Sequence, residues 1–237
     1  MLRIFLFVLF YVASNGLMAA ENGVEISRIS SSSYGTSFLV KSPAGVKVAM
    51  DPSSVIENLK ANVITVSHFH PDHMDYPFQQ DMKAKGAPVF ENSKADWQKG
   101  DVKISSVPAM HNPVPLKPEA PSNTIFVVET AGLRIAHFGD LGQTDFTPEQ
   151  LASLGRIDVA FMQFENSNSA LIATEGRAFR LMSKIKPRLI VPTHVAGQAW
   201  TMLRKAYSPV LKAGSVLRVS ADTLPEQTRV VELDFPN

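Results

Sequence analysis

The sequence predicts a mixed α/β (α+β) fold in which helices cover two β-sheets. Most of the chain beyond residue 20 consists of short runs rich in Val, Ile and Phe that end at Gly, Pro, Asn or Asp, which is typical of strands. Helical patterns are fewer and alternate with these runs only in part, which favours two sheets over one regularly wound parallel sheet. The chain has 237 residues, 45% of them hydrophobic, and no repeat or linker divides it, so we expect residues 21–237 to form one domain.

The elements follow from these patterns in chain order. The expected strands are Val24–Ile29, Thr36–Lys41, Val46–Met50, Val63–Ser67, Val102–Val107, Thr124–Glu129, Arg134–His137, Val159–Phe164, Leu189–Val191, Val216–Val219 and Val230–Leu233. Helices are expected over Asp75–Lys85, over Thr147–Leu154 after a Thr-Pro start signal, over Thr174–Ile185 and over Ala196–Ala206. Proline is dense from Pro108 to Pro121, which predicts a long, stiff loop of the kind that usually carries function.

The first twenty residues have the layout of a secretory signal peptide. A single charge, Arg3, precedes an apolar run from Ile4 to Ala13, and the small residues Ala19 and Ala20 come before polar Glu21. The run is shorter than the about 20 apolar residues of a membrane span, although an uncleaved anchor helix is the alternative. We therefore expect a signal peptide over residues 1–20, no stable membrane span after its cleavage, and a periplasmic or secreted protein.

Composition excludes several functional classes. The chain has 23 basic and 22 acidic side chains, and removal of residues 1–20 would take away one Arg and leave 22 of each. A neutral chain without a basic run lacks the electrostatic footprint of a nucleic-acid-binding protein. Because Cys is absent, the chain has no disulfide, no thiolate nucleophile, no Cys-ligated metal and no cysteine to carry a lipid.

Three of the six histidines fall within one short motif. His68, His70 and His73 lie in the segment Ser67-His68-Phe69-His70-Pro71-Asp72-His73, directly after the apolar run 63–66. In an extended segment His68 and His70 project to the same side, and the turn after Pro71 can bring Asp72 and His73 to a neighbouring position. This grouping matches what two adjacent divalent ions require, whereas packed or surface histidines are the alternative.

Three further polar residues also follow apolar strands, and they are His111, Asp140 and His194. Each alone could belong to an ordinary turn or loop. Together with the histidine motif, however, they complete a tetrahedral or octahedral ligand set. We expect His137 to be a packed or supporting histidine rather than a ligand.

The ordered pattern, from His68-x-His70-x-Asp72-His73 to His111, Asp140 and His194, resembles the metallo-β-lactamase-fold superfamily of metal-dependent hydrolases. Met50-Asp51-Pro52 is similar to the early Asp that ends a strand in that family, and the resemblance spans roughly residues 26–235. It implies a four-layer αββα sandwich with a metal site at one edge, between the sheets. It also implies that His68, His70 and His111 hold one ion, that Asp72, His73 and His194 hold the second, that Asp140 bridges both, and that Asp51 supports the histidine loop from beneath.

The resemblance favours some branches of the superfamily over others. Its true β-lactamases usually lack the bridging Asp, and several use a Cys ligand, whereas this chain has Asp140 and no Cys. Its flavin-linked oxygen reductases have Glu where His70 stands, and its tRNA-processing nucleases do not fit an exported, neutral protein. The spacing of the motifs is more similar to the compact lactonase-like and phosphodiesterase-like branch.

We therefore expect an exported hydrolase with two divalent ions, in which a metal-bridged hydroxide cleaves an ester, lactone or similar carbonyl bond. Asp72 is the expected catalytic side chain, because it both binds metal and can orient the nucleophile or carry its proton. Zn²⁺ is the default metal for His and Asp ligands, and Mn²⁺ or Fe²⁺ is also compatible. The alternatives are a phosphodiesterase of the same fold and a non-catalytic exported protein that binds a metal or another ligand.

The expected partner is a small-molecule substrate, and the sequence does not predict the oligomeric state. Candidate substrate contacts are Tyr76, Phe78, the segment 112–121 and Glu165-Asn166-Ser167-Asn168, although a solvated loop is the alternative for each of them. These segments contain no cationic cluster for a phosphorylated sugar, which favours an ester or lactone over a phosphodiester.

Overall fold

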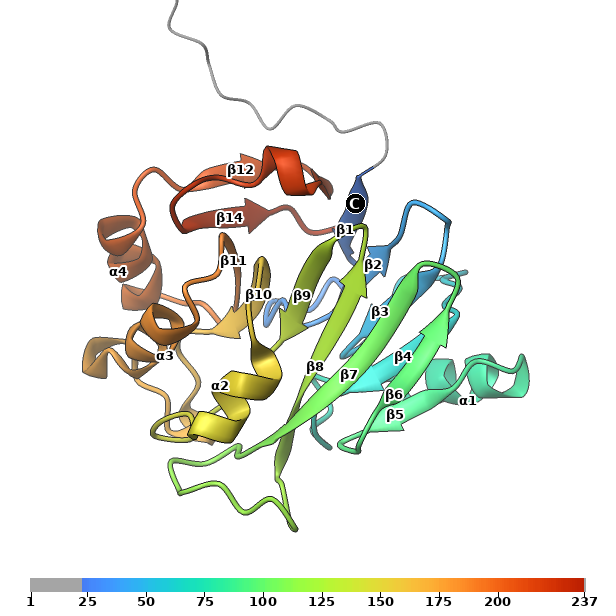
Figure 1. Ribbon diagram of the computed structural model, residues 1–237, viewed down its shortest axis with the longest axis horizontal. Helices are drawn as coiled ribbons and strands as arrows, with labels where there is room; N and C mark the ends of the chain where they lie inside the picture. Colours follow the sequence, from blue (N-terminus) through green and yellow to red (C-terminus); the bar gives the residue numbers. More distant parts are fainter. Residues whose placement is uncertain (1–22, 237) are drawn as a thin grey trace, which may run out of the picture.

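The computed structural model describes residues 23–236, which form two β-sheets packed face to face with helices on both outer faces (Figure 1). This arrangement confirms the expected four-layer αββα sandwich. The signal peptide expected over residues 1–20 lies outside the described residues. Within residues 23–236, no helix is both long and apolar enough to cross a membrane.

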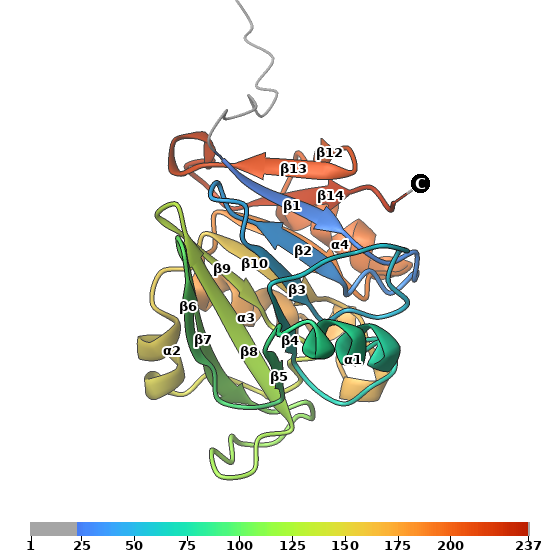
Figure 2. The same cartoon turned by 90° about the vertical axis from the view of Figure 1, so that its right-hand side faces the viewer.

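The first sheet has six strands in the order β13-β1-β2-β3-β4-β5 (Figure 2). Its members are β1 (Val24–Arg28), β2 (Phe38–Lys41), β3 (Lys47–Met50), β4 (Val63–Val66), β5 (Val89–Glu91) and β13 (Val216–Val219). The pairs from β13 to β3 are antiparallel, whereas β3, β4 and β5 run parallel to one another.

The second sheet has eight strands in the order β12-β14-β11-β10-β9-β8-β7-β6. Its members are β6 (Asp96–Lys99), β7 (Val102–Ala109), β8 (Asn123–Thr130), β9 (Leu133–His137), β10 (Val159–Gln163), β11 (Leu189–Thr193), β12 (Leu211–Ala213) and β14 (Arg229–Leu233). The pairs from β6 to β9 are antiparallel, and the strands from β9 to β12 run parallel. As a result, β7, β9, β10 and β11 all point the same way.

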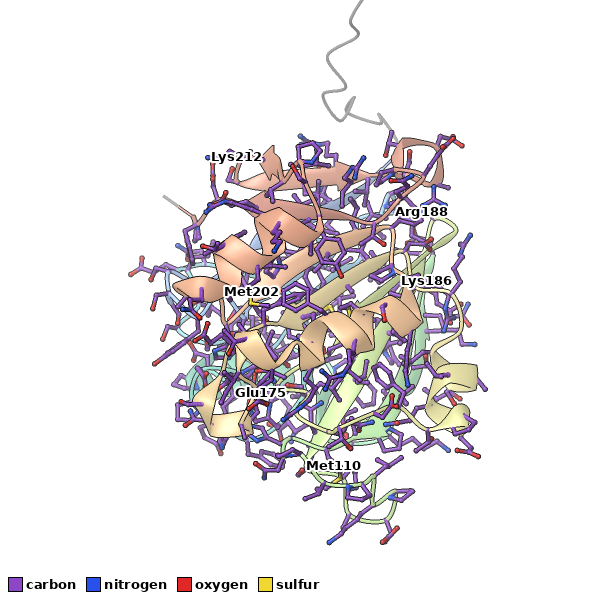
Figure 3. All side chains as sticks on the ribbon, turned by 90° about the vertical axis from the view of Figure 1, so that its left-hand side faces the viewer. Met110, Glu175, Lys186, Arg188, Met202 and Lys212 are labelled. Atoms are coloured by element: carbon purple, nitrogen blue, oxygen red, sulfur yellow. The ribbon has the colours of Figure 1, made fainter. Side chains whose placement is uncertain are left out.

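The helices divide unequally between the two outer faces. Helix α1 (Tyr76–Ala84) covers the six-stranded sheet, and α2 (Pro148–Leu154), α3 (Arg177–Ile185) and α4 (Gln198–Ala206) lie over the eight-stranded sheet. Figure 3 views the latter face, where α3 and α4 lie side by side and Met202 of α4 is labelled near their junction. Short 3₁₀ turns occupy η1 (Ser167–Ser169), η2 (Ala173–Glu175) and η3 (Ala221–Thr223).

The alternation of side chains along the central strands builds two of the three apolar layers. In β10, Val159 and Phe161 face the layer between the sheets, whereas Ala160 and Met162 face the layer beneath the helices. Phe161 is fully buried and stacks on Phe38 of the opposite sheet, with ring centroids 4.1 Å apart. Because successive strand residues point to opposite faces, a run of consecutive apolar residues supplies both layers at once.

The starts of α1 and α2 agree with local sequence signals. Thr147 caps α2 by accepting a hydrogen bond from the amide of Gln150, and Pro148 occupies the first helical turn. Asp75 caps α1 in the same way by accepting from the amide of Phe78. Both side chains satisfy amide groups that a helix leaves without a partner at its start.

Several elements differ from the expectation. The short strands β5, β6 and β12 differ from the expectation, because each is an edge strand of three or four residues without an apolar run long enough to predict it. β7 continues two residues further, through Pro108 to Ala109, where it pairs only with β8 and the missing amide of proline breaks no ladder. The third helix begins at Arg177 rather than Thr174, because Gly176 in the left-handed region, with φ of 69°, ends a 3₁₀ turn before it.

Substitution of a residue between the sheets tests this packing. Ile104 of β7 is fully buried in the layer between the sheets, so we expect Ile104→Ala to lower the free energy of unfolding by about 2–5 kcal/mol in urea denaturation. Ile56→Ala is the matched control, because Ile56 is 39% exposed and should change that free energy by less than about 0.5 kcal/mol. Equal effects of the two substitutions would contradict the proposed layer.

Candidate metal centre

All seven expected metal ligands lie at one edge of the sandwich. His68, His70, Asp72 and His73 follow β4, and the remaining three follow β7, β9 and β11: these are His111, Asp140 and His194. Within the eight-stranded sheet the three strands point the same way, so their carboxyl ends meet at one edge. The loop after β4 reaches the same edge, because the amide of Thr124 in β8 donates to the carbonyl of Ser67 at 2.9 Å.

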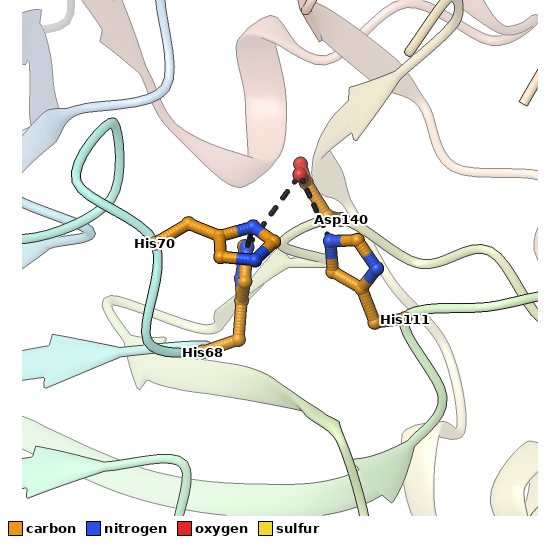
Figure 4. Close-up of side chains that lie close together, drawn as sticks. All are labelled: His68, His70, His111 and Asp140. Atoms are coloured by element: carbon orange, nitrogen blue, oxygen red, sulfur yellow. Dashed lines mark hydrogen bonds and ion pairs between the residues drawn. The ribbon is translucent and has the colours of Figure 1, made fainter. Parts of the chain in front are cut away.

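The side chains form two groups that share one carboxylate. The first contains His68, His70, His111 and Asp140, and the second contains Asp72, His73, Asp140 and His194. In each group, one nitrogen or oxygen atom per residue lies within 4.8 Å of all the others. Figure 4 shows the first group, in which His68 and His70 of one loop converge with His111 and Asp140 of two other segments.

Asp140 stands between the two groups with one oxygen toward each. Its Oδ2 lies 3.5 Å from Nε2 of both His68 and His111. Its Oδ1 lies 3.2 Å from Nε2 of both His73 and His194. The carboxylate is fully buried, so its negative charge must be compensated by neighbouring donors and by whatever the two groups bind.

The donor set fits divalent cations. Within the described part of the chain, His111 Nε2 and Asp140 Oδ1 are buried and have no hydrogen-bond partner. Pairs of ring nitrogens also approach closely, at 3.1 Å for His68 Nε2 and His70 Nδ1 and at 3.3 Å for His73 Nε2 and His194 Nε2. Tetrahedral bonds of about 2.0–2.1 Å to one ion place two ligand atoms about 3.3–3.4 Å apart, which is close to this spacing.

The electrostatic field of the site also favours a cation. Burial raises the pKa of the Asp140 carboxyl, but the four surrounding imidazoles hold it well below its usual range. Burial lowers the pKa of His73, yet the carboxylates of Asp140 and Asp51 outweigh it and raise that pKa to about 10. Burial lowers the pKa of His68, which keeps its imidazole neutral and able to bind a metal.

Asp51 lies where the resemblance implied, beneath the histidine loop. It follows β3, is buried, and accepts hydrogen bonds from the amide and hydroxyl of Ser67 at 2.7 and 2.5 Å. Its Oδ2 also accepts from His73 Nδ1 at 2.7 Å, which leaves Nε2 of that ring directed at the metal group. Burial raises the pKa of Asp51, but the imidazoles of His137 and His73 lower it to about 2, so its charge is retained.

Asp140 is held by two side chains whose role the sequence did not predict. Its amide donates to Asn123 Oδ1 at 3.1 Å, and Asn166 Nδ2 donates to its Oδ2 at 2.7 Å. Gly139 before it has a φ of 54°, and a Cβ there would collide with the side chain of Ser67. Asn166 was expected only as a candidate substrate contact, whereas its buried amide positions Asp140. No local signal marks Asn123, because its role depends on how the sheets pack.

His137 is packed outside both groups, as expected. Its Nε2 donates to the carbonyl of Thr36 at 2.7 Å, and its Nδ1 accepts from the amide of Gly139 at 3.0 Å. Burial lowers its pKa, with the charge of Asp51 acting in the opposite direction. The ring therefore links the loop before β2 to the loop that carries Asp140.

The candidate substrate contacts differ in their exposure and in their position relative to the metal centre. Tyr76 is 61% exposed, but Phe78 is buried between α1 and the six-stranded sheet, so the expectation of a substrate contact at Phe78 is wrong. The segment 112–121 forms a largely exposed loop beyond His111, which projects at the bottom of Figure 1. The segment 165–168 lines a cavity of about 480 Å³ that also borders His194.

The comparisons with known proteins agree with this fold. Residues 32–194 match the family described as "Beta-lactamase superfamily domain". The chain is similar to a Thermotoga maritima protein described as a Zn-dependent hydrolase of the metallo-beta-lactamase superfamily, with 21% identity, a TM-score of 0.67, and coverage of 90% of this chain and 100% of that chain. A Parabacteroides distasonis protein described as a metal-dependent hydrolase has 20% identity and a TM-score of 0.60, with coverage of 89% and 94%.

A third similar structure is the metallo-beta-lactamase fold protein YhfI from Bacillus subtilis. It has 13% identity and a TM-score of 0.56, and the match covers 88% of this chain and 96% of that chain. At such identities the likeness establishes the fold. The comparison with curated proteins found no match.

Substitution of the shared carboxylate tests the two-group arrangement. We expect Asp140→Asn to weaken metal binding at both positions by about tenfold or more, because it removes the charge that both groups face. Calorimetric titration with Zn²⁺ and metal analysis by mass spectrometry measure the affinities and the stoichiometry. Asp145→Asn, at a side chain 55% exposed, is the control and should leave both unchanged. Loss at one position alone would contradict the shared role.

Proposed function

The chain belongs to the beta-lactamase superfamily, and from this premise we propose that it is an exported dinuclear metal-dependent hydrolase that cleaves an ester, lactone or similar carbonyl bond. The observation that carries the proposal is the placement of Asp140, whose two oxygens face two separate sets of imidazoles. Two divalent ions held there would supply an acidified water and polarise the substrate oxygen. Zn²⁺ is the default for this donor set, with Mn²⁺ or Fe²⁺ as compatible ions.

The open side of the centre lies at His70 and Asp72. These two are the half-buried members of the ligand groups, whereas the other five are buried. Asp72 Oδ2 lies 3.4 Å from Nε2 of His194, and the Asp72 side chain is 19% exposed. It can therefore accept a proton from the attacking water and return it to the leaving group without leaving the site.

Open positions argue against a purely structural or metal-storage role. Structural metal sites are closed by four protein ligands, whereas catalytic sites keep a position for water or substrate. Here a half-buried carboxylate and a cavity of about 480 Å³ adjoin the ligand groups. Both features support a substrate that reaches the centre.

The cavity supports a carbonyl substrate over a phosphodiester. Its lining residues, all within the described chain, include Glu165 but no Lys or Arg. A phosphodiester would carry its negative charge toward this carboxylate, and the cavity wall has no cationic side chain to offset the repulsion. An ester or lactone is neutral at the reacting group and meets no such repulsion.

A chromogenic panel of esters, lactones and phosphodiesters tests the reaction class. We expect the Zn²⁺-loaded protein to hydrolyse an ester or lactone and to lose this activity on chelation, with two ions per chain by mass spectrometry. Hydrolysis of phosphodiesters alone would establish the phosphodiesterase alternative. Two bound ions without any hydrolysis would favour the non-catalytic alternative.

Asp72→Asn tests the proton-transfer role within that panel. The amide keeps an oxygen at the position but accepts no proton, so we expect kcat at saturating Zn²⁺ to fall by about a hundredfold or more. Asp81→Asn, in the exposed part of α1 with a side chain 54% exposed, is the control and should retain kcat. Full activity of Asp72→Asn would contradict the assigned role.

Localisation and N-terminal sequencing of the expressed protein test the proposed export. Expressed with residues 1–237 in a Gram-negative host, the protein should appear in the periplasm or medium, with Glu21 as the first residue in N-terminal sequencing. Leu9→Arg interrupts the apolar run and should leave the precursor uncleaved in the cytoplasm. Recovery of an uncleaved wild-type chain from the membrane would establish the anchor alternative.

A further inference from the structure

A cavity of about 480 Å³ lies beside the metal centre and ends at His194. We propose that it binds a cationic group of the substrate, an alkylammonium or guanidinium, and that Glu165 is the side chain that recognises this group. The inference rests on the proposed function, because it concerns the substrate of the same site.

The backbone fixes Glu165 next to a candidate metal ligand. Beyond β10 the chain continues alongside β11, so that the amide of Phe164 donates to the carbonyl of Thr193 at 3.3 Å. The amide of Glu165 then donates to the carbonyl of His194 at 2.9 Å. The backbone of Glu165 is therefore anchored to the same segment that carries His194.

In the described part of the chain, the carboxylate of Glu165 has no ion pair, in contrast to those of Glu129 and Glu175. Among the described residues, its Oε2 is buried and has no hydrogen-bond partner, and no Lys, Arg or His nitrogen forms an ion pair with it. Elsewhere Glu129 pairs with Arg134 at 2.6 Å and Glu175 pairs with Arg177 at 3.3 Å. A buried carboxylate oxygen without a donor is costly, and the half-buried Glu165 side chain also lines the cavity, so a ligand bound there can supply the donor that the protein does not.

The rest of the cavity wall suits an alkyl chain that ends in a cation. Tyr34, 53% exposed, lines it with an aromatic ring whose centroid lies 5.2 Å from that of His194. Leu171 and Ile172 add apolar surface, and the lining includes no Lys or Arg. An aromatic face and a carboxylate together attract an ammonium group, whereas an anion would be repelled.

Matched ligand pairs test the inference by binding rather than by turnover. The probes are ω-amino carboxylates and the alkanoates that carry CH₃ in place of NH₃⁺: 4-aminobutyrate with pentanoate, 6-aminohexanoate with heptanoate, and 8-aminooctanoate with nonanoate. In each pair the carboxylate is a ligand for the Zn²⁺-loaded centre, and the chain length varies the reach of the ammonium. For at least one pair we expect calorimetry to give about tenfold tighter binding of the amino acid.

Two variants assign the preference to Glu165. Glu165→Gln keeps the size of the side chain and removes its charge, so we expect it to abolish the preference for the ammonium and leave alkanoate binding unchanged. Glu226→Gln removes the same charge at an exposed position before β14 and should retain the preference. If Glu165→Gln does not fold, as judged by circular dichroism, the wild-type comparison still decides, because equal binding within every pair overturns the inference.

The outcomes separate this inference from the proposed function. Hydrolysis of esters together with equal binding of every ligand pair would overturn the inference and leave the hydrolase in place. A preference for the ammonium that Glu165→Gln leaves intact would also overturn the inference. A preference that depends on Glu165, in a protein that hydrolyses nothing, would support the cation site and overturn the hydrolase.

Discussion

A buried negative charge at Asp140 is the constraint on which the rest of the site depends. The side chain is fully buried, and a carboxylate removed from water must be compensated by positive charge or by several donors. Four imidazoles from three loops surround it at 3.2–3.5 Å. Because the imidazoles are themselves good metal ligands when neutral, the arrangement is balanced best by cations between the rings and the carboxylate.

Two residues at strand ends, one from each sheet, have backbone conformations that their residue types disfavour. Asp51 and His194 follow strands with φ of 46° and 43°, a region that residues other than glycine rarely adopt. Such conformations persist because the sheets fix the chain on both sides: the amide of His194 donates to the carbonyl of Tyr34 at 2.8 Å, and that of Asp51 donates to the carbonyl of Thr65 at 2.8 Å. Backbone hydrogen bonds of the fold thus position both the candidate ligand His194 and the supporting Asp51.

The local features of this site could be predicted from the sequence. The spacing of His68, His70 and His73 and their position after an apolar strand could be interpreted without tertiary information, and the four-layer fold followed from the resemblance. What it could not reveal depends on contacts between distant segments. Asn166 contacts Asp140 only because β10 lies next to β9, and the edge strands β6 and β12 form against neighbours without an apolar pattern of their own. Phe78 was misassigned because the hydrophobic face of α1 buries it.

The segment after β10 couples metal placement to substrate selection. Asn166 and Leu171 exchange two backbone hydrogen bonds of 2.8 Å, which close a tight loop around the exposed residues Ser167 and Asn168. At one end of this loop the amide of Asn166 holds Asp140, and at the other Leu171 and Ile172 line the cavity next to Glu165. A substitution that shifts the loop therefore moves a metal-positioning amide together with the cavity wall. Some substitutions should change the substrate preference and leave the metal centre intact. We expect these to be substitutions of side chains that do not disturb the backbone pairing of Asn166 and Leu171.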